Sequence, residues 1–182
     1  MIKTCIRSII RNSVGGPFGP PDRRWVYTLS GVDDFIQLPA IPLEIGDTVE
    51  FDMVTGPSTG LNREIIGPNP GYIQVTDTGL WNIFGFTLTV DGITKETNDL
   101  APIDGAVHKI VATSTGSQSL TYVGCSGGTS LFSTESIRNL KVGPNSFYPL
   151  DDGWSGNPVL LDTLGGQHGV AVNFQEDGWE KQ

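Results

Sequence analysis

The chain has 182 residues, of which 37% are hydrophobic, and it contains 24 glycines and 12 prolines. This composition favours one compact domain of many short strands over a bundle of long helices. The formal net charge of −9 argues against nucleic-acid binding, because phosphate contacts need a basic surface. No stretch of about 18 apolar residues is present, so we expect no membrane span. Arg7 and Arg11 interrupt the first residues, so we also expect no export signal.

The charge is divided unequally along the chain. Residues 1–24 carry a net charge of +4 and residues 25–182 a net charge of −13. Residues 15–21 (GGPFGPP) cannot continue a helix or a central strand. We therefore expect residues 1–24 to form a basic arm that docks on an acidic neighbour, such as another copy of this chain. The contact residues of this arm would be Lys3, Arg7, Arg11, Arg23 and Arg24.

Short β-type segments alternate with glycine turns from residue 25 onwards. We predict strands at residues 25–29, 35–38, 48–54, 64–66, 71–75, 80–84, 86–90, 107–113, 120–125 and 137–142. Within 48–54, Val49, Phe51 and Met53 alternate with polar residues, as in a half-buried strand. Asp91 and Gly92 tolerate positive φ and so predict a hairpin turn. Without βαβ alternation, an antiparallel sandwich is favoured, although this pattern alone does not separate a jelly roll from a barrel.

The last 38 residues are too apolar for a segment that is free in water. Val170, Val172 and Phe174 alternate as in a strand, and Gly165-Gly166 suggests a turn before them. We therefore predict that residues 145–182 form a C-terminal extension that folds back on the sandwich or pairs with a neighbouring copy, adding at least one strand. The large apolar residues of this extension are Tyr148, Trp154, Val159, Leu161, Val170, Val172, Phe174 and Trp179.

Several short motifs follow one another in a recognisable order. They are residues 29–38 (LSGVDDFIQL), 90–92 (VDG), 104–113 (DGAVHKIVAT), 122–124 (YVG) and 137–142 (IRNLKV). In this order the chain resembles the laminin-G-like domains of the concanavalin A-like group, as carried by bacteriophage virion proteins. One departure is Val107, where the family often has an aromatic residue. The resemblance implies an all-β antiparallel jelly-roll sandwich over residues 25–144.

The same resemblance implies a function. We expect a non-enzymatic structural protein of a phage particle, made in the host cytoplasm and placed on the capsid surface, as a decoration, or on the tail. Its partners would be other copies of itself and the major capsid protein or tail proteins. One alternative is a glycan-binding module for host attachment, and a second is a divergent polysaccharide hydrolase. Fold alone does not decide among them.

Carboxylates on the strand at residues 48–54 are the sharpest catalytic candidates. Glycosidases of this fold carry a Glu-x-Asp motif followed by a second Glu, and a retaining mechanism needs two carboxyls about 5–5.5 Å apart. Here Glu50 and Asp52 are followed by Val54 and Thr55 at the two positions where that Glu could fall. The chain also lacks a Gly-x-Ser-x-Gly elbow for a serine nucleophile. We predict that it is not an enzyme.

Loop carboxylates and tryptophans are the remaining site candidates. Laminin-G-like domains often hold one Ca²⁺ on a loop rim, where Asp33, Asp34, Asp91 and Asp104 are the candidates here, with Asp99, Asp151 and Asp152 as further loop carboxylates. No contiguous calcium-binding loop is present, so we expect no cofactor, and Ca²⁺ stays open. Trp25 and Trp81 lie in strand patterns and are expected in the core, whereas Trp154 and Trp179 are candidates for protein or glycan contacts. Cys5 and Cys125 have no disulfide or zinc spacing.

Overall fold

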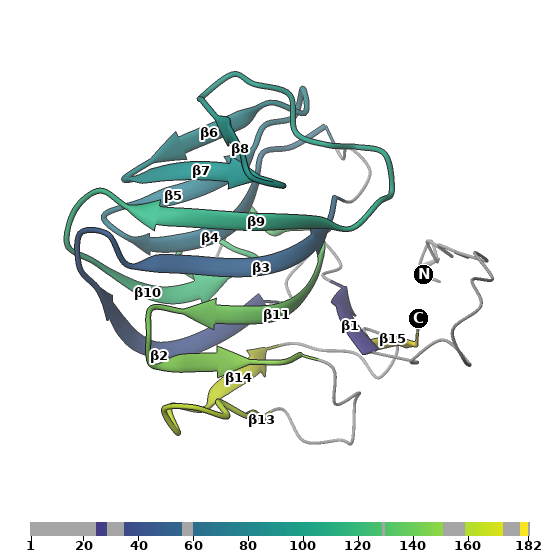
Figure 1. Ribbon diagram of the computed structural model, residues 1–182. Helices are drawn as coiled ribbons and strands as arrows, with labels where there is room; N and C mark the ends of the chain where they lie inside the picture. Colours follow the sequence, from purple (N-terminus) through teal and green to yellow (C-terminus); the bar gives the residue numbers. More distant parts are fainter. Residues whose placement is uncertain are drawn as a thin grey trace, which may run out of the picture.

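The computed structural model is an all-β sandwich of two stacked antiparallel sheets, which confirms the predicted fold class (Figure 1). The structure describes residues 25–28, 35–55, 60–128, 130–150, 159–172 and 179–181. No helix in these ranges is long and apolar enough to cross a membrane.

Eight of the described strands form the first sheet. They are β1 (Trp25–Thr28), β3 (Thr48–Val54), β7 (Phe86–Val90), β8 (Ile93–Lys95), β9 (His108–Ser114), β11 (Ser136–Val142), β12 (Ser146–Tyr148) and β15 (Trp179–Lys181). Their order is β15-β1-β11-β3-β9-β7-β8, and β12 also pairs with β11. In Figure 1, β1 and β15 lie to one side of the two stacked sheets.

Seven described strands form the second sheet. They are β2 (Phe35–Leu43), β4 (Arg63–Asn69), β5 (Tyr72–Val75), β6 (Trp81–Phe84), β10 (Gln118–Val123), β13 (Val159–Leu160) and β14 (Gly169–Val172). Their order is β13-β14-β2-β10-β4-β5-β6. Strands far apart in the sequence are therefore neighbours, as β10 is of β2 and β4.

The core lies between the two sheets and is built from alternating side chains. In β3, Val49, Phe51 and Met53 are buried while the residues between them are half-buried, as the period of two predicts. Trp81 on β6 is also buried in this core, as predicted for it. Its burial from water makes it one of the largest hydrophobic contributions to the sandwich.

Strand β2 continues five residues beyond its predicted end at Leu38. Pro39 and Pro42 suggested a break, because proline cannot donate a hydrogen bond to a neighbouring strand. Strand β14, however, pairs only with Phe35–Gln37, so within the described residues the rest of β2 is paired on one side, by β10. Proline is tolerated there because none of the described strands lies on the open side and needs its N–H.

Turn and tail contacts complete the two sheets. Asp91 and Gly92 have φ values of 52° and 78° and connect β7 to β8, which confirms the predicted hairpin. The alternation at Val170 and Val172 corresponds to β14, which extends the second sheet next to β2. The short strands β12 and β13 also come from the tail, and β15 pairs with β1, with Trp25 opposite Lys181.

Candidate functional site

Charged side chains cover the outer face of the eight-stranded sheet. On β3, Glu50 lies between two lysines: its Oε2 is 3.3 Å from Lys109 Nζ, and its Oε1 is 3.4 Å from Lys141 Nζ. Burial raises the pKa of Glu50, but the two lysines outweigh it and leave the pKa below its usual value. This carboxylate is an ionised partner in a row of ion pairs.

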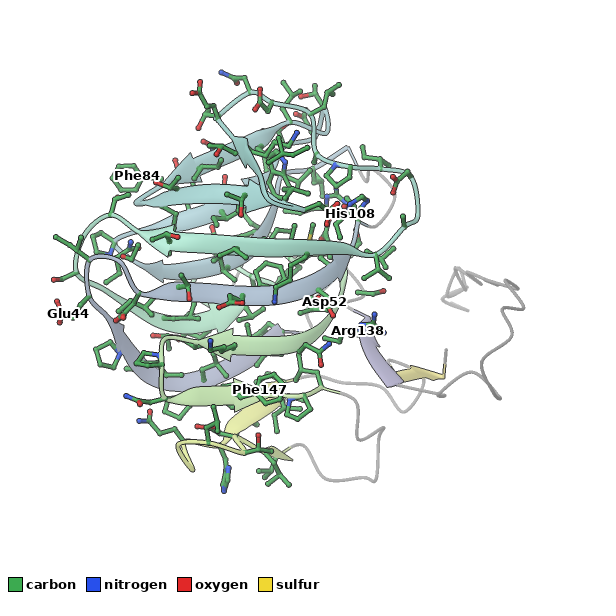
Figure 2. All side chains as sticks on the ribbon, in the orientation of Figure 1. Glu44, Asp52, Phe84, His108, Arg138 and Phe147 are labelled. Atoms are coloured by element: carbon green, nitrogen blue, oxygen red, sulfur yellow. The ribbon has the colours of Figure 1, made fainter. Side chains whose placement is uncertain are left out.

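Asp52 is held by the neighbouring strand β11. Its Oδ2 is 3.3 Å from Nε of Arg138, and both residues are labelled in Figure 2. The same oxygen accepts a hydrogen bond of 2.7 Å from Asn139 Nδ2. Asn139 has a φ of 53° and lies where the pairing of β3 and β11 shifts register. Val54 and Thr55, which occupy the positions of the missing second glutamate, are both buried. Glu50 and Asp52 thus share one face, as predicted, and both are engaged with cations.

The outer face of the seven-stranded sheet is different, because none of its exposed or half-buried side chains is charged. Arg63 and Glu64 are the charged residues of these seven strands, and both are buried. We call this surface the uncharged face. It consists of Gln37, Pro39, Ala40 and Pro42 on β2, Tyr72 on β5, Asn82 and Phe84 on β6, Ser119, Thr121 and Tyr122 on β10, Val159 on β13, and Val170 and Val172 on β14.

A hydrogen-bonded polar row crosses one half of the uncharged face. Gln74 Nε2 donates to Glu64 Oε2 (2.8 Å), and Asn82 Nδ2 donates to Gln74 Oε1 (3.1 Å). Burial raises the pKa of Glu64, although Gln74 and Ser126 donate hydrogen bonds that oppose the change. Gly67 leaves room for this carboxylate, because a Cβ there would collide with Glu64 Oε1. Beside the row, the rings of Tyr72 and Phe84 have centroids 5.7 Å apart.

A buried ion pair fastens the segment that follows β10 to the sandwich. Arg63 Nη1 is 3.0 Å from Glu135 Oε1 and 2.9 Å from Thr134 Oγ1, and the two charged side chains are 1% and 0% exposed. Burial raises the pKa of Glu135, and the positive charge of Arg63 opposes that rise. Glu64 N donates to Leu131 O (2.8 Å), which holds the middle of the same segment on β4.

Two of the predicted calcium ligands meet at a histidine. His108 Nδ1 is 2.7 Å from Asp91 Oδ2, and His108 Nε2 is 2.9 Å from Asp104 Oδ1. Burial lowers the pKa of His108, but the two carboxylates outweigh it and raise the pKa above its usual value. The bond to His108 in turn lowers the pKa of each aspartate. A protonated His108 therefore fastens the loop before β9 to the β7–β8 turn.

We expect the contacts of His108 with Asp91 and Asp104 to change the pH at which His108 titrates. Because its pKa is raised, the stability it adds is fully present below the usual value of 6.5 and is lost as the pH rises through the pKa of the folded state. NMR of the imidazole should place that pKa above 6.5, and Asp104→Asn should lower it. Asp99→Asn, which changes a carboxylate that accepts from Glu96 N instead, should leave it unchanged. Titration of His108 below 6.5 would contradict the contact geometry.

A third buried carboxylate, Asp162, holds the tail. Asp162 Oδ1 accepts hydrogen bonds from the backbone N–H groups of Phe147, Leu164 and Gly165, at 2.9–3.0 Å, and its Oδ2 accepts one from Gln167 N at 3.1 Å. Burial alone would raise the pKa of Asp162, but these four donors lower it to about 2. Asp162 thereby fixes the turn between β13 and β14 against β12.

Most of the other predicted site residues cannot be placed in the site. Lys3, Arg7, Arg11, Arg23, Arg24, Asp33, Asp34 and Trp154 lie outside the described residues. Trp179 lies in β15, opposite Tyr27. Within the described ranges, no group of three or more His, Cys, Asp or Glu side chains is arranged to hold a metal ion. Cys125 is a buried free thiol, and burial raises its pKa to about 11.

Comparisons with known proteins complete this description. No protein-family model, no curated protein and no solved structure matches the chain. The structure itself shows an all-β, two-sheet antiparallel sandwich.

Proposed function

We propose that this chain is a non-enzymatic structural protein of a phage particle, which attaches to the capsid or tail through protein–protein contacts. The resemblance of residues 25–142 to laminin-G-like domains of virion proteins supports the assignment of this chain to a phage particle. The uncharged face supports the attachment, and it is the observation that carries the proposal.

The contrast between the two outer faces explains why the uncharged face suits a partner. A solvated face of an antiparallel sheet normally carries polar and charged residues, as the eight-stranded sheet does with Glu50, Asp52 and Lys109. Docking such a face to a protein would cost free energy, because each charge loses water. On the uncharged face no exposed charge has to be dehydrated.

The uncharged face also has a suitable size. Seven strands spaced about 4.8 Å apart and about 20 Å long cover on the order of 600 Å². A stable protein interface buries about 800 Å² on each partner. The sheet together with the loops beside it therefore offers enough surface for a specific contact.

The test is incorporation into particles. Mass spectrometry of purified virions should detect the chain at a fixed number of copies. Gln37→Lys combined with Ser119→Lys places two charges on the uncharged face and should lower that number about tenfold or more. Thr87→Lys combined with Thr89→Lys places the same charges on the outer face of β7 and should leave it unchanged.

Two results would overturn the proposal. If the chain is absent from purified particles, it is not a virion protein. If both double variants are incorporated as well as the unchanged chain, attachment does not use the uncharged face.

Glycan binding is the second candidate, favoured by one end of the same face. Phe84 is 56% exposed and its ring lies beside Tyr72, with Asn82 as a neighbouring amide. Sugar rings bind to such aromatic surfaces and take hydrogen bonds from amides. A glycan array should then show specific binding that Phe84→Ala abolishes, and absence of binding would leave attachment to proteins as the function.

A further inference from the structure

The end of the sandwich formed by residues 91–107 exposes an apolar surface. Ile93 is 64% exposed, Leu100 is 72% exposed, and Ile103 and Val107 are also exposed. Single exposed aliphatic residues are common on proteins, but here four lie within 15 residues of one another, and clustered exposed apolar side chains are typical of interaction sites. We call these four side chains the apolar rim.

The backbone of the apolar rim is fixed by hydrogen bonds. Ala101 N donates to Gly79 O (2.9 Å), and Trp81 N donates to Asp99 O (2.8 Å), so this segment runs along β6. The Ile103 side chain lies over Gly79, where a Cβ would come within 2.9 Å of its Cδ1. The bonds of His108 to Asp91 and Asp104 hold the other end. The aliphatic side chains are therefore presented by an anchored surface.

Acidic residues surround the apolar rim. Residues 77–80 and 91–108 contain five carboxylates, one lysine and His108, which gives a net charge of −3 when His108 is protonated. The carboxylates are Asp77, Asp91, Glu96, Asp99 and Asp104, and all five residues are exposed. An occupant that matches this surface has aliphatic side chains spaced between cations.

Residues 1–24 of this chain have that composition. They contain Ile2, Ile6, Ile9 and Ile10 between basic residues and carry a net charge of +4. We propose that the basic arm, residues 1–24, docks on the apolar rim and its acidic surround. The basic arm would then match the acidic surround in charge and the apolar rim in apolar character. This inference does not depend on the phage particle, because both surfaces belong to this chain.

The arm is long enough to reach the rim. In the eight-stranded sheet, β1 is separated from β8 by five strand spacings, or about 24 Å. An extended chain of 24 residues spans up to about 80 Å. The rim is thus accessible to the arm of the same chain and to that of a neighbouring copy.

Limited trypsin digestion of the full chain tests the proposal, because trypsin cleaves after the basic residues of the arm. Docking should protect these bonds. Ile93→Ser combined with Leu100→Ser should speed cleavage of the arm about tenfold, and 0.5 M salt should speed it in the unchanged chain. The control is Ile45→Ser combined with Leu61→Ser, which removes two other exposed aliphatic side chains and should not change the rate.

A photo-crosslinking residue at position 100 gives a second readout. Adducts that map to residues 1–24 by mass spectrometry support the docking, whether they join one chain or two copies. Equal cleavage rates in the unchanged chain and the rim variant would overturn the proposal, as would adducts that map only outside residues 1–24.

Discussion

Glu135→Gln should lower the free energy of unfolding by about 3 kcal/mol. The change keeps the shape of the side chain but removes the negative charge that faces Arg63 in the core, where both side chains are at most 1% exposed. Breaking a buried pair from one side is costly because the remaining charge has lost both water and its counter-charge. Chemical denaturation monitored by fluorescence measures the effect.

A matched control separates burial from charge. Glu50→Gln removes a carboxylate that also faces two cations, but on the solvated side of β3, and should cost no more than about 0.5 kcal/mol. Replacing both members of the buried pair, with Arg63→Met and Glu135→Leu, should recover part of the loss. Equal costs for Glu135→Gln and Glu50→Gln would show that the Arg63–Glu135 pair is not buried in solution.

Asp162→Asn should cost about 2 kcal/mol and loosen the tail. The carboxylate accepts four backbone hydrogen bonds, and its pKa of about 2 lies well below the usual value of 3.8. A lowered pKa adds stability that is present above 3.8 and is lost as the pH falls through about 2. Denaturation curves between pH 7 and pH 2 should therefore converge for the two proteins at the acidic end.

Hydrogen exchange locates the same effect. In Asp162→Asn the amides of Leu164, Gly165 and Gln167 should exchange faster, because each donates to this carboxylate. Asp99→Asn removes the charge from a carboxylate that accepts a single backbone N–H at an exposed turn, and should cost less than about 1 kcal/mol. Unchanged exchange at all three amides would contradict the role given to Asp162.

The sheet architecture could be predicted where local pattern and burial agree. Alternation in residues 48–54 and the Asp91-Gly92 turn are local signals, and the structure has β3 and the β7–β8 hairpin at these places. The end of β2 could not be predicted, because tolerance of Pro39 depends on where a strand 130 residues later stops pairing. The strands β12 and β13, with three and two residues, are too short to show a period.

The contacts of the charged residues were harder to predict from the sequence. Arg63 and Glu64 are adjacent, yet the first faces the core beside Glu135 and the second lies under the uncharged face, and only the strand register assigns them to opposite sides. Asp91 and Asp104 were selected from the sequence as candidate calcium ligands, and the contact that they share in the structure, with His108, could not be predicted. The uncharged face did leave a signal in the sequence, because residues 35–43 and 118–123 contain no charged residue.

Two prolines in the part of β2 that is paired on one side affect how copies of this chain can pack against one another. A sheet edge with free N–H and C=O groups can recruit a strand from another molecule and so begin aggregation. Along Pro39–Leu43, where the described part of the chain provides no partner beyond β10, Pro39 and Pro42 have no N–H to offer an incoming strand. Along this stretch of edge, copies packed closely together can therefore meet through their side chains without adding a backbone ladder. The two residues that interrupt the strand pattern in the sequence thus oppose strand addition at this part of β2.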